Sequence, residues 1–191
     1  MADPANECFA LRREDGSLTG EIKPRALVHR DGDLHGASHV FLARLHNGRA
    51  EVLLQKRSTQ KDSFPGLYDI SAAGHLDPGE DFARRELAEE LGVTGEAPEF
   101  LFAQRNEYHG AFHGKPFHDN EIAWVYLLVL DRPEAAFTPE ACEVESVHWF
   151  SVREILRAMR ENDPRFCLRE AEFCRLLPYL AQKFGIPVDK L

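Results

Sequence analysis

The stretch from residue 74 to residue 93 constrains the fold of this chain more than any other. It reads Gly-His-Leu-Asp-Pro-Gly-Glu-Asp-Phe-Ala-Arg-Arg-Glu-Leu-Ala-Glu-Glu-Leu-Gly-Val, a glycine-containing loop followed by a segment with helical periodicity. On a helix, residues three and four apart share a face, so the apolar residues of this segment form a stripe for a core. The acidic residues Glu86, Glu89 and Glu90 project together on another face.

This acidic face indicates a bound cation. Like charges in adjacent helical turns repel each other by roughly 0.2–0.5 kcal/mol per pair, which a purely structural helix more often relieves with lysines. Carboxylate oxygens suit Mg²⁺ or Mn²⁺, whose coordination is usually completed by water and substrate phosphates. A solvated acidic helix is the alternative, which the Glu-Glu pair alone would favour. The loop glycines, Glu80, Arg85 and a helix-ending glycine at Gly92 favour the metal site.

Together these residues resemble the Nudix box, the loop and helix signature of Nudix hydrolases, which cleave a nucleoside diphosphate linked to another group. The resemblance implies an α/β fold, an α/β/α sandwich with a mixed sheet and a loop-helix catalytic motif. It also implies a salt-bridge partner at Arg85 that orients the site. The metal ligands that it implies are Glu80, Glu86, Glu89 and Glu90.

The spacing departs from the family pattern at one place. The family has seven residues between the loop glutamate and the arginine, whereas four residues separate Glu80 from Arg85 here. Removing three residues shortens a helix by about 4.5 Å and rotates the later residues by about 60° from register. The helix glutamates stay coherent among themselves, but the position of Glu80 relative to them is open. A non-catalytic diphosphate-binding module with a disabled site is therefore one alternative.

A second set of residues extends the resemblance to isopentenyl diphosphate isomerase and the Nudix hydrolases similar to it. It includes residues 29–39, Gln55-Lys-Arg57 and Pro65-Gly-Leu-Tyr-Asp69. This resemblance implies a divalent metal held by three histidines and two carboxylates, namely His29, His35, His75, Asp119 and Glu121. Such a set suits Mn²⁺ or Zn²⁺ better than Mg²⁺. For each histidine alone, a surface or hydrogen-bonding role is the alternative.

The residue before the loop distinguishes isomerisation from hydrolysis. Isomerases of this type carry a catalytic cysteine there, whereas this chain has Ala73, which holds no ionisable proton. Isomerisation needs one group that protonates and another that deprotonates, and Glu121 alone supplies one acid or base. The intact acidic helix favours hydrolysis of a phosphoanhydride, with Glu89 or Glu90 receiving the proton of the attacking water.

The substrate is less well defined by the sequence. Candidates for phosphate contacts are the basic residues Lys56, Arg57 and Lys61 and the loop glycine Gly74, with a solvated surface position as the alternative for each basic residue. Candidates for stacking on a nucleobase, or else for the sheet core, are Tyr108, Phe112, Phe117 and Trp124. No residue selects among nucleoside diphosphates, nucleoside triphosphates, dinucleotides and prenyl-type diphosphates.

Composition limits the remaining possibilities. The 191 residues, 43% of them hydrophobic, predict one domain over residues 1–191, with an N-terminal strand and connection at 1–20 and a C-terminal helical extension at 165–191. The net charge of −9 disfavours a nucleic-acid polymer or an anionic membrane as a partner, leaving a small-molecule diphosphate. The cysteines form no Cys-x-x-Cys pair, no apolar run reaches membrane-spanning length and the polar start is not a signal peptide, so a cytoplasmic location is expected.

The hydrophobic pattern predicts a strand-rich core around one central helix. Asn47-Gly48 predicts a hairpin between strands at 39–45 and 51–57. Further extended segments are predicted at 8–12, 26–29, 100–105, 122–130 and 144–150, with a connection at 20–24. Helices are predicted at 81–91, from a capping box at Ser151-Val-Arg-Glu154 towards Arg160, and at 170–184.

Overall fold

The computed structural model describes residues 7–75 and 82–191. Within these residues the elements are β1 Cys8–Arg12, β2 Leu18–Pro24, α1 Arg25–Asp31, β3 His35–His46, β4 Arg49–Arg57, β5 Tyr68–Asp69, β6 Ala72–His75, α2 Phe82–Leu91, β7 Glu99–Phe112, β8 Lys115–Val129, the 3-10 turn η1 Glu134–Ala136, β9 Val144–Ser151, α3 Val152–Arg160, α4 Glu170–Phe184 and the 3-10 turn η2 Val188–Lys190.

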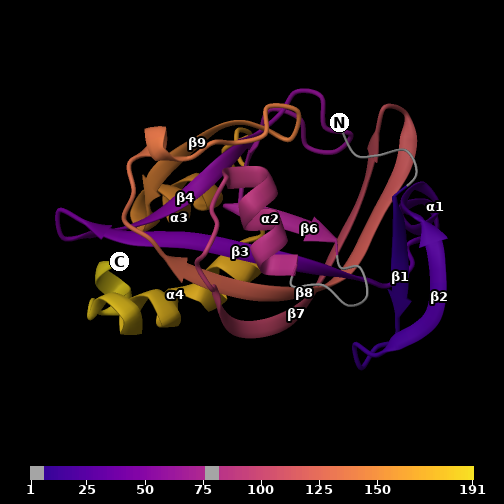
Figure 1. Ribbon diagram of the computed structural model, residues 1–191, viewed down its shortest axis with the longest axis horizontal. Coiled ribbons are helices and arrows are strands. Elements are labelled where there is room, and N and C mark those ends of the chain that lie inside the picture. Colours follow the sequence, from indigo (N-terminus) through magenta and orange to yellow (C-terminus); the bar gives the residue numbers. More distant parts are fainter. Residues whose placement is uncertain (1–6, 76–81) are drawn as a thin grey trace.

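A mixed sheet forms the centre of the molecule (Figure 1). Its main path is β5-β4-β3-β8-β7, with β6 added to β3 and β9 added to β4. β3 and β8 run parallel, whereas the other described pairs in this sheet are antiparallel. The predicted hairpin is present, since β3 and β4 pair around Asn47, whose φ of 48° places it in the left-handed region that such a turn requires.

Helices cover both faces of this sheet. α2 packs Ala83, Leu87 and Leu91 against one face. α3 and α4 pack against the other face, where Ile155 and Phe173 are among the buried residues. Burying a leucine, isoleucine or phenylalanine side chain stabilises a fold by roughly 1.5–3 kcal/mol, so these two clusters hold the layers together. The predicted α/β/α sandwich with a mixed sheet is confirmed.

β3 and β4 separate at one end of the sheet, and this fork positions the site. The last residues of β3 pair with β4, whereas Ala37–Val40 pair with β6. Ser71 lies in the fork, where its hydroxyl accepts the Leu42 N–H at 2.8 Å and donates to the Leu53 carbonyl at 2.5 Å. The fork lets β6 lie between the first half of β3 and α2, which carries the acidic residues.

The N-terminal residues form a small lobe beyond the sheet, with β1 and β2 paired and α1 packed against β8 (Figure 1). The predictions of an extended segment at 26–29 and a connection at 20–24 were wrong, because α1 and β2 occupy these residues. Pro24 precedes the helix and Gly32, with a φ of 73°, ends it. Seven residues between these two breakers are too few to display a helical repeat, and the run Ala-Leu-Val resembles a strand.

Most other predicted elements are confirmed. α4 spans residues 170–184 as predicted, and Ser151 and Glu154 form the capping box of α3. α2 ends at Leu91 and is followed by Gly92, whose φ of 67° is left-handed as the sequence suggested. β7 and β8 are much longer than predicted, because the added residues lack a clear hydrophobic pattern, and four of them, Tyr108, Phe117, Asp119 and Glu121, line a cavity. Among the described residues, no helix is long and apolar enough to cross a membrane.

Candidate functional site

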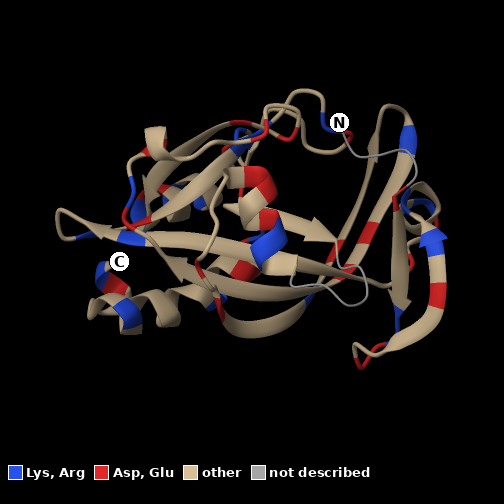
Figure 2. Ribbon diagram, in the orientation of Figure 1, with Lys and Arg blue, Asp and Glu red and all other residues tan. Residues whose placement is uncertain are grey.

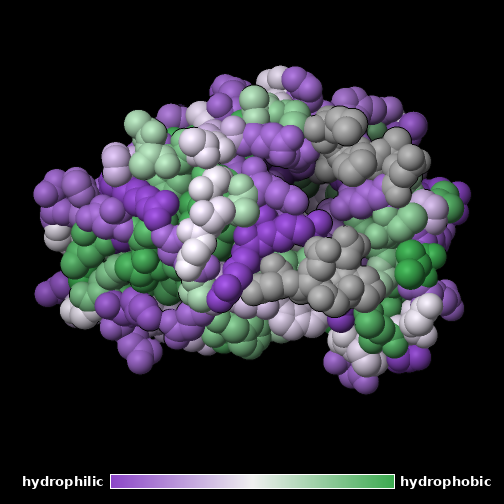
Figure 3. Space-filling model, viewed as in Figure 1, coloured by the Kyte–Doolittle hydropathy of each residue, from purple (hydrophilic) through white to green (hydrophobic). Residues whose placement is uncertain are grey.

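A cavity of about 650 Å³ lies between α2, the β7–β8 hairpin and the segment that enters α4. Its described lining is mostly charged, with acidic residues from α2 and β8 and basic residues from α1, β4 and the start of α4. Figure 2 shows acidic residues on α2 and on the strands behind it. Figure 3 shows hydrophilic residues gathered across the same face of the molecule. A cavity with both signs of charge can receive a cation and an anionic ligand together.

The acidic residues of α2 meet at this cavity, as the helical spacing predicts. Glu86, Glu89 and Glu90 all line it, with Glu89 exposed and the other two buried. Glu90 is held firmly, because its Oε2 accepts hydrogen bonds from Gln55 Nε2 and from the Ala73 N–H, both at 2.9 Å.

Arg85 lies beside this group, on the same helix. It donates to Glu86 Oε1 at 2.9 Å and to the His75 carbonyl at 3.3 Å. Arg85 therefore links α2 to the end of β6 and holds the carboxylate of Glu86 next to that strand.

Burial makes this acidic group costly in the absence of a cation. Loss of solvent and the neighbouring Glu90 raise the pKa of Glu86 to about 8. Loss of solvent raises the pKa of Glu90 to about 7. A divalent ion would remove this penalty, and carboxylate oxygens are the ligands that Mg²⁺ and Mn²⁺ take.

Gly74 makes room for Glu86. A Cβ atom at Gly74 would lie 2.0 Å from Glu86 Oε1 and 2.1 Å from the carboxyl carbon. Gly74 pairs with Ser38 in the sheet, so its backbone has little freedom to move away. The sequence placed Gly74 in a loop, but this residue lies in β6, where a glycine is needed because the Glu86 carboxylate packs directly against its Cα.

Gly74→Ala is expected to displace Glu86 and to weaken Mn²⁺ binding at the α2 glutamates about 10- to 100-fold, the range found when groups that support a ligand are lost. Calorimetric titration with Mn²⁺ measures this change. In the double variant Gly74→Ala/Glu86→Asp, the shorter carboxylate leaves room for the methyl group, and part of the affinity is expected to return. Wild-type affinity in the single variant would contradict this steric interpretation.

Three histidines meet at the other side of the cavity. His29 lies in the last turn of α1, His35 begins β3 and His75 ends β6, and one ring nitrogen of each lies within 4.8 Å of the others. Burial disfavours the charged imidazolium, so it lowers the pKa of His35 and lowers that of His75 well below its ordinary value. Both rings are therefore neutral at pH 7, the form in which imidazole binds a metal.

His35 and Asp119 indicate where a cation fits. His35 Nδ1 donates to the Asp33 carbonyl at 3.0 Å, so Nε2 carries the lone pair. That Nε2 lies 3.5 Å from Asp119 Oδ1, and both atoms are buried without a hydrogen bond to any described residue. Glu121 places an oxygen within 4.8 Å of both. Two electron-rich atoms that face each other in a buried site suit a shared divalent ion.

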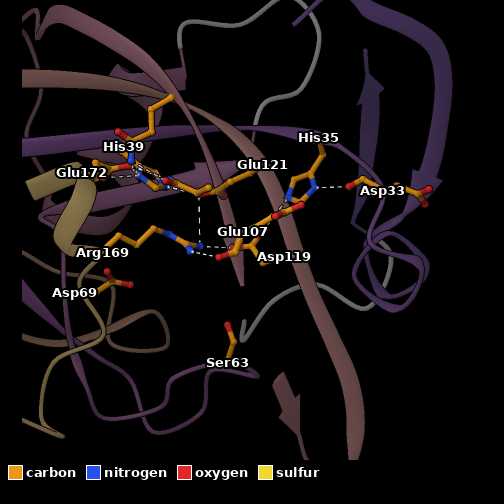
Figure 4. A network of polar contacts seen from close by, with 12 residues as sticks. Asp33, His35, His39, Ser63, Asp69, Glu107, Asp119, Glu121, Arg169 and Glu172 are labelled. Atoms are coloured by element: carbon orange, nitrogen blue, oxygen red, sulfur yellow. Dashed lines mark hydrogen bonds and ion pairs between the residues drawn. The ribbon is translucent and has the colours of Figure 1, made fainter. Parts of the chain in front are cut away.

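A buried polar network adjoins this cluster (Figure 4). His39 Nδ1 donates to Glu172 at 2.9 Å, and His39 Nε2 lies 3.3 Å from Glu121 Oε1. Although burial opposes it, the carboxylates of Glu172 and Glu121 hold the pKa of His39 well above its ordinary value. Burial alone would raise the pKa of Glu121, but the His39 imidazolium holds this pKa below its ordinary value. Arg169 pairs with Asp119 and lies 3.6 Å from Glu121.

Two of the three basic residues predicted to bind phosphate lie at the cavity, and one does not. Arg57 and Lys61 line the cavity, where Arg57 pairs with Asp69 at 3.1 Å and Lys61 pairs with Glu143. Lys56 lies outside the described lining and pairs with Glu145 at 2.7 Å in a partly exposed position. Lys56 is therefore not placed to contact a ligand in this cavity.

Three of the four candidate aromatic residues gather near the cavity. Tyr108 and Phe117 line it together with Phe64, and Phe112 packs against Phe64 with ring centroids 4.9 Å apart. The fourth residue, Trp124, stacks under the guanidinium of Arg12 at 4.6 Å and is not part of the described lining.

Some residues of the site were not among the candidates drawn from the sequence. Missed lining residues include Arg25, His39, Arg169 and Glu172, and Asn106 joins them through hydrogen bonds. The spacing of Arg169 and Glu172 at the start of a helix, three residues apart, was the one available clue. The predicted ligand Glu80 lies outside the described residues.

Comparison with known proteins gives the family. The NUDIX domain model matches residues 36–170. "Nudix hydrolase 3" of Arabidopsis thaliana is 38% identical over 194 residues, which cover 97% of this chain but 25% of that protein. An isopentenyl-diphosphate Delta-isomerase of Ruegeria pomeroyi is 33% identical over 142 residues, covering 73% of this chain and 74% of that protein. The chain thus spans a quarter of the length of the Arabidopsis relative.

Solved structures show the same fold at lower identity. DR0079 of Deinococcus radiodurans matches with a TM-score of 0.58 and 19% identity, over 81% of this chain and 90% of that one. The Nudix hydrolase RenU of M. smegmatis matches with a TM-score of 0.53 and 18% identity, over 91% and 94%. The fold defines an α/β/α protein in which one helix brings an acidic group to a cavity. The chain belongs to the Nudix superfamily, in the branch that resembles isopentenyl diphosphate isomerase, and Nudix hydrolases generally use divalent metal ions.

Proposed function

We propose that this chain is a metal-dependent hydrolase that cleaves a phosphoanhydride bond in a nucleoside diphosphate derivative or a related small-molecule diphosphate. One observation carries the proposal, namely that Glu86, Glu89 and Glu90 line the same cavity as Arg57 and Lys61. The acidic group suits Mg²⁺ or Mn²⁺, and the basic residues suit phosphate oxygens.

In this proposal, Glu86, Glu89 and Glu90 hold the metal ion. A bound divalent ion supplies charge neutralisation at phosphate oxygens and acidifies a water molecule. Glu90 accepts the proton of the attacking water, because Gln55 and the Ala73 N–H fix one carboxylate oxygen and because its pKa of about 7 suits a base at neutral pH. Glu89 is the alternative base. Arg85 positions Glu86.

The histidine and carboxylate cluster is a proposed second site for a divalent ion. Its ligands in this proposal are His29, His35, His75, Asp119 and Glu121. The facing atoms His35 Nε2 and Asp119 Oδ1 support it. Mixed imidazole and carboxylate ligands favour Mn²⁺ over Mg²⁺ there. Glu121 is also an alternative general base, since it lines the cavity.

We propose fewer substrate-contacting residues than the sequence suggested. Arg57 and Lys61 contact phosphate oxygens, whereas Lys56 points elsewhere. Gly74 contributes the space that Glu86 occupies. The aromatic residues around Tyr108 and Phe117 adjoin the non-phosphate part of the substrate, in keeping with either a nucleobase or a prenyl-type group.

An isomerase acting on isopentenyl diphosphate is the second candidate. The close approach of the three histidines, Asp119 and Glu121 favours it, as do the relatives named for that activity. Ala73 opposes it, because alanine cannot transfer a proton to or from an alkene. A module that binds a diphosphate without cleaving it is the third candidate, and the shortened loop supports that one.

One assay decides among these candidates. The purified chain is incubated with nucleoside diphosphates, nucleoside triphosphates, dinucleotides and prenyl diphosphates, with Mg²⁺, Mn²⁺ or chelator, and phosphate products and double-bond isomers are measured. We expect cleavage of at least one diphosphate class with either metal and none with chelator. Isomerisation without phosphate release would establish the second candidate, and binding without any turnover would establish the third.

We also propose that residues 1–191 form one domain, with 165–191 as a C-terminal helical extension. The packing of α4 against the central sheet supports this organisation. A cytoplasmic location and the absence of nucleic-acid and membrane partners stay predictions.

A further inference from the structure

The helix α4 brings a buried carboxylate to the cavity from outside the matched part of the family. The family match ends at residue 170, whereas Glu172 lies in the first turn of α4 and is 2% exposed. Glu172 nevertheless lines the cavity together with Glu121. The roles proposed above for hydrolysis do not use it.

Two bridges connect Glu172 with Glu121, and the one through His39 is labelled in Figure 4. In the first, His39 contacts Glu172 through Nδ1 at 2.9 and 3.0 Å and Glu121 through Nε2 at 3.3 Å. In the second, Asn106 Nδ2 donates to Glu172 Oε2 at 2.9 Å and to Glu121 Oε1 at 3.1 Å. Asn106 is itself oriented, because its Oδ1 accepts a hydrogen bond from Gln104 at 2.8 Å. Both bridges reach the same oxygen of Glu121.

A purely structural role explains this arrangement poorly. An acidic residue in the first helical turn interacts favourably with the helix dipole, but the exposed Glu170 already supplies that interaction at the same helix end. Burying charged groups costs free energy that pairing only partly recovers, and apolar replacements of buried ion pairs are often as stable. The network is therefore better explained by what it does to Glu121.

We propose that Glu172 is a positioning residue for Glu121, acting through His39 and Asn106. The two bridges hold Glu121 Oε1 and thereby set the plane of the carboxylate. A carboxylate with a fixed plane presents its oxygens in a defined direction to His35 and Asp119, the residues with which Glu121 clusters. This inference rests on the proposed function, in which Glu121 acts on a metal ion or on the substrate.

The first test compares Glu172→Gln with Glu170→Gln, which removes an acidic residue from the same helix turn but not from the cavity. Glu172→Gln is expected to lower kcat and to weaken Mn²⁺ binding, each about 10- to 100-fold, the usual cost of losing a group that orients a ligand. KM for the diphosphate should stay within about twofold, since in this proposal Glu172 acts through Glu121 and not on the substrate itself. Glu170→Gln should match the wild type in all three quantities.

The second test is a double-mutant cycle. In the Glu121→Gln background, Glu172→Gln should have almost no further effect on kcat or on Mn²⁺ affinity, because it acts through Glu121. Independent, multiplying effects would overturn the proposal, as would a folded Glu172→Gln protein with wild-type kcat and Mn²⁺ affinity. His39→Gln, which breaks the first bridge, should reproduce the loss and serves if Glu172→Gln does not fold.

The same cycle separates this inference from the proposed function. If the wild type binds Mn²⁺ but cleaves no diphosphate, hydrolysis is wrong, and the coupling between Glu172 and Glu121 in Mn²⁺ affinity still decides the positioning role. Coupling in Mn²⁺ affinity supports it, and additive effects overturn it. Absence of both cleavage and Mn²⁺ binding would overturn the two together.

Discussion

Glu90→Gln is expected to lower kcat about 10²- to 10⁴-fold, the range that a positioned general base contributes. Glutamine keeps an oxygen that can accept the hydrogen bonds from Gln55 and the Ala73 N–H, but it cannot take a proton from water. It also removes a charge from the proposed metal ligands. Steady-state hydrolysis of the diphosphate that the wild type cleaves, with Mg²⁺ and with Mn²⁺, measures the effect.

The fold should survive this change and the metal-free protein should become more stable. Burial raises the pKa of Glu90 from 4.5 to about 7, so its ionised form is disfavoured in the folded state. Stability is therefore lost as the pH rises from 4.5 towards 7, and the loss persists at pH 8. With chelator at pH 8, Glu90→Gln should show a higher Tm than the wild type.

A matched control is Glu99→Gln, which removes an exposed acidic residue of β7 that pairs with Lys183 at 2.7 Å. Its kcat should equal that of the wild type. Wild-type turnover by Glu90→Gln would exclude Glu90 as the base and as an essential ligand. A lower Tm for Glu90→Gln in chelator would show that the burial of its charge does not cost stability.

The acidic face of α2 was predictable because helical periodicity is a local property. Spacing alone placed Glu86, Glu89 and Glu90 together, and the structure brings all three to the cavity. The alternation of side chains along a strand is equally local, and it would have separated Lys56 from Arg57. Adjacent residues of a strand point to opposite faces, so only one of this pair can face the cavity, and it is Arg57.

The network around Glu121 was not predictable from local patterns. His39 and Glu172 are 133 residues apart in the sequence and meet because α4 packs across the sheet. Asn106 meets Glu121 because of the register between β7 and β8, which no short motif specifies. Buried charged residues of this kind look like surface residues in a sequence, since burial of charge is the exception.

Mn²⁺ binding to the α2 glutamates is expected to weaken strongly as the pH falls. In the metal-free protein, the pKa of Glu86 is raised to about 8 by burial and by Glu90, and that of Glu90 to about 7 by burial. A proton and a metal ion compete for the same oxygens, so ligands must lose their protons before binding. Between pH 8 and pH 6 the apparent affinity should fall by about two to three orders of magnitude, because the titration of both groups is linked to binding.

The histidine cluster should respond to pH differently, which makes the two proposed sites separable. Burial lowers the pKa values of His35 and His75, so protons compete less for these ligands than for ordinary histidines. Asp119, whose pKa is raised to about 7 by burial and by Glu121, is the ligand of this cluster for which protons compete with the metal most strongly between pH 6 and pH 8.

Calorimetry in buffers of different ionisation enthalpy counts the protons that Mn²⁺ binding releases. At pH 6, we expect Mn²⁺ binding to release more protons at the α2 site than at the histidine site. Glu86→Gln should remove the steep pH dependence of Mn²⁺ affinity at the α2 site and leave the shallower pH dependence at the histidine site. Equal pH dependence at both sites, or none at the α2 site, would contradict the burial of these carboxylates as the cause.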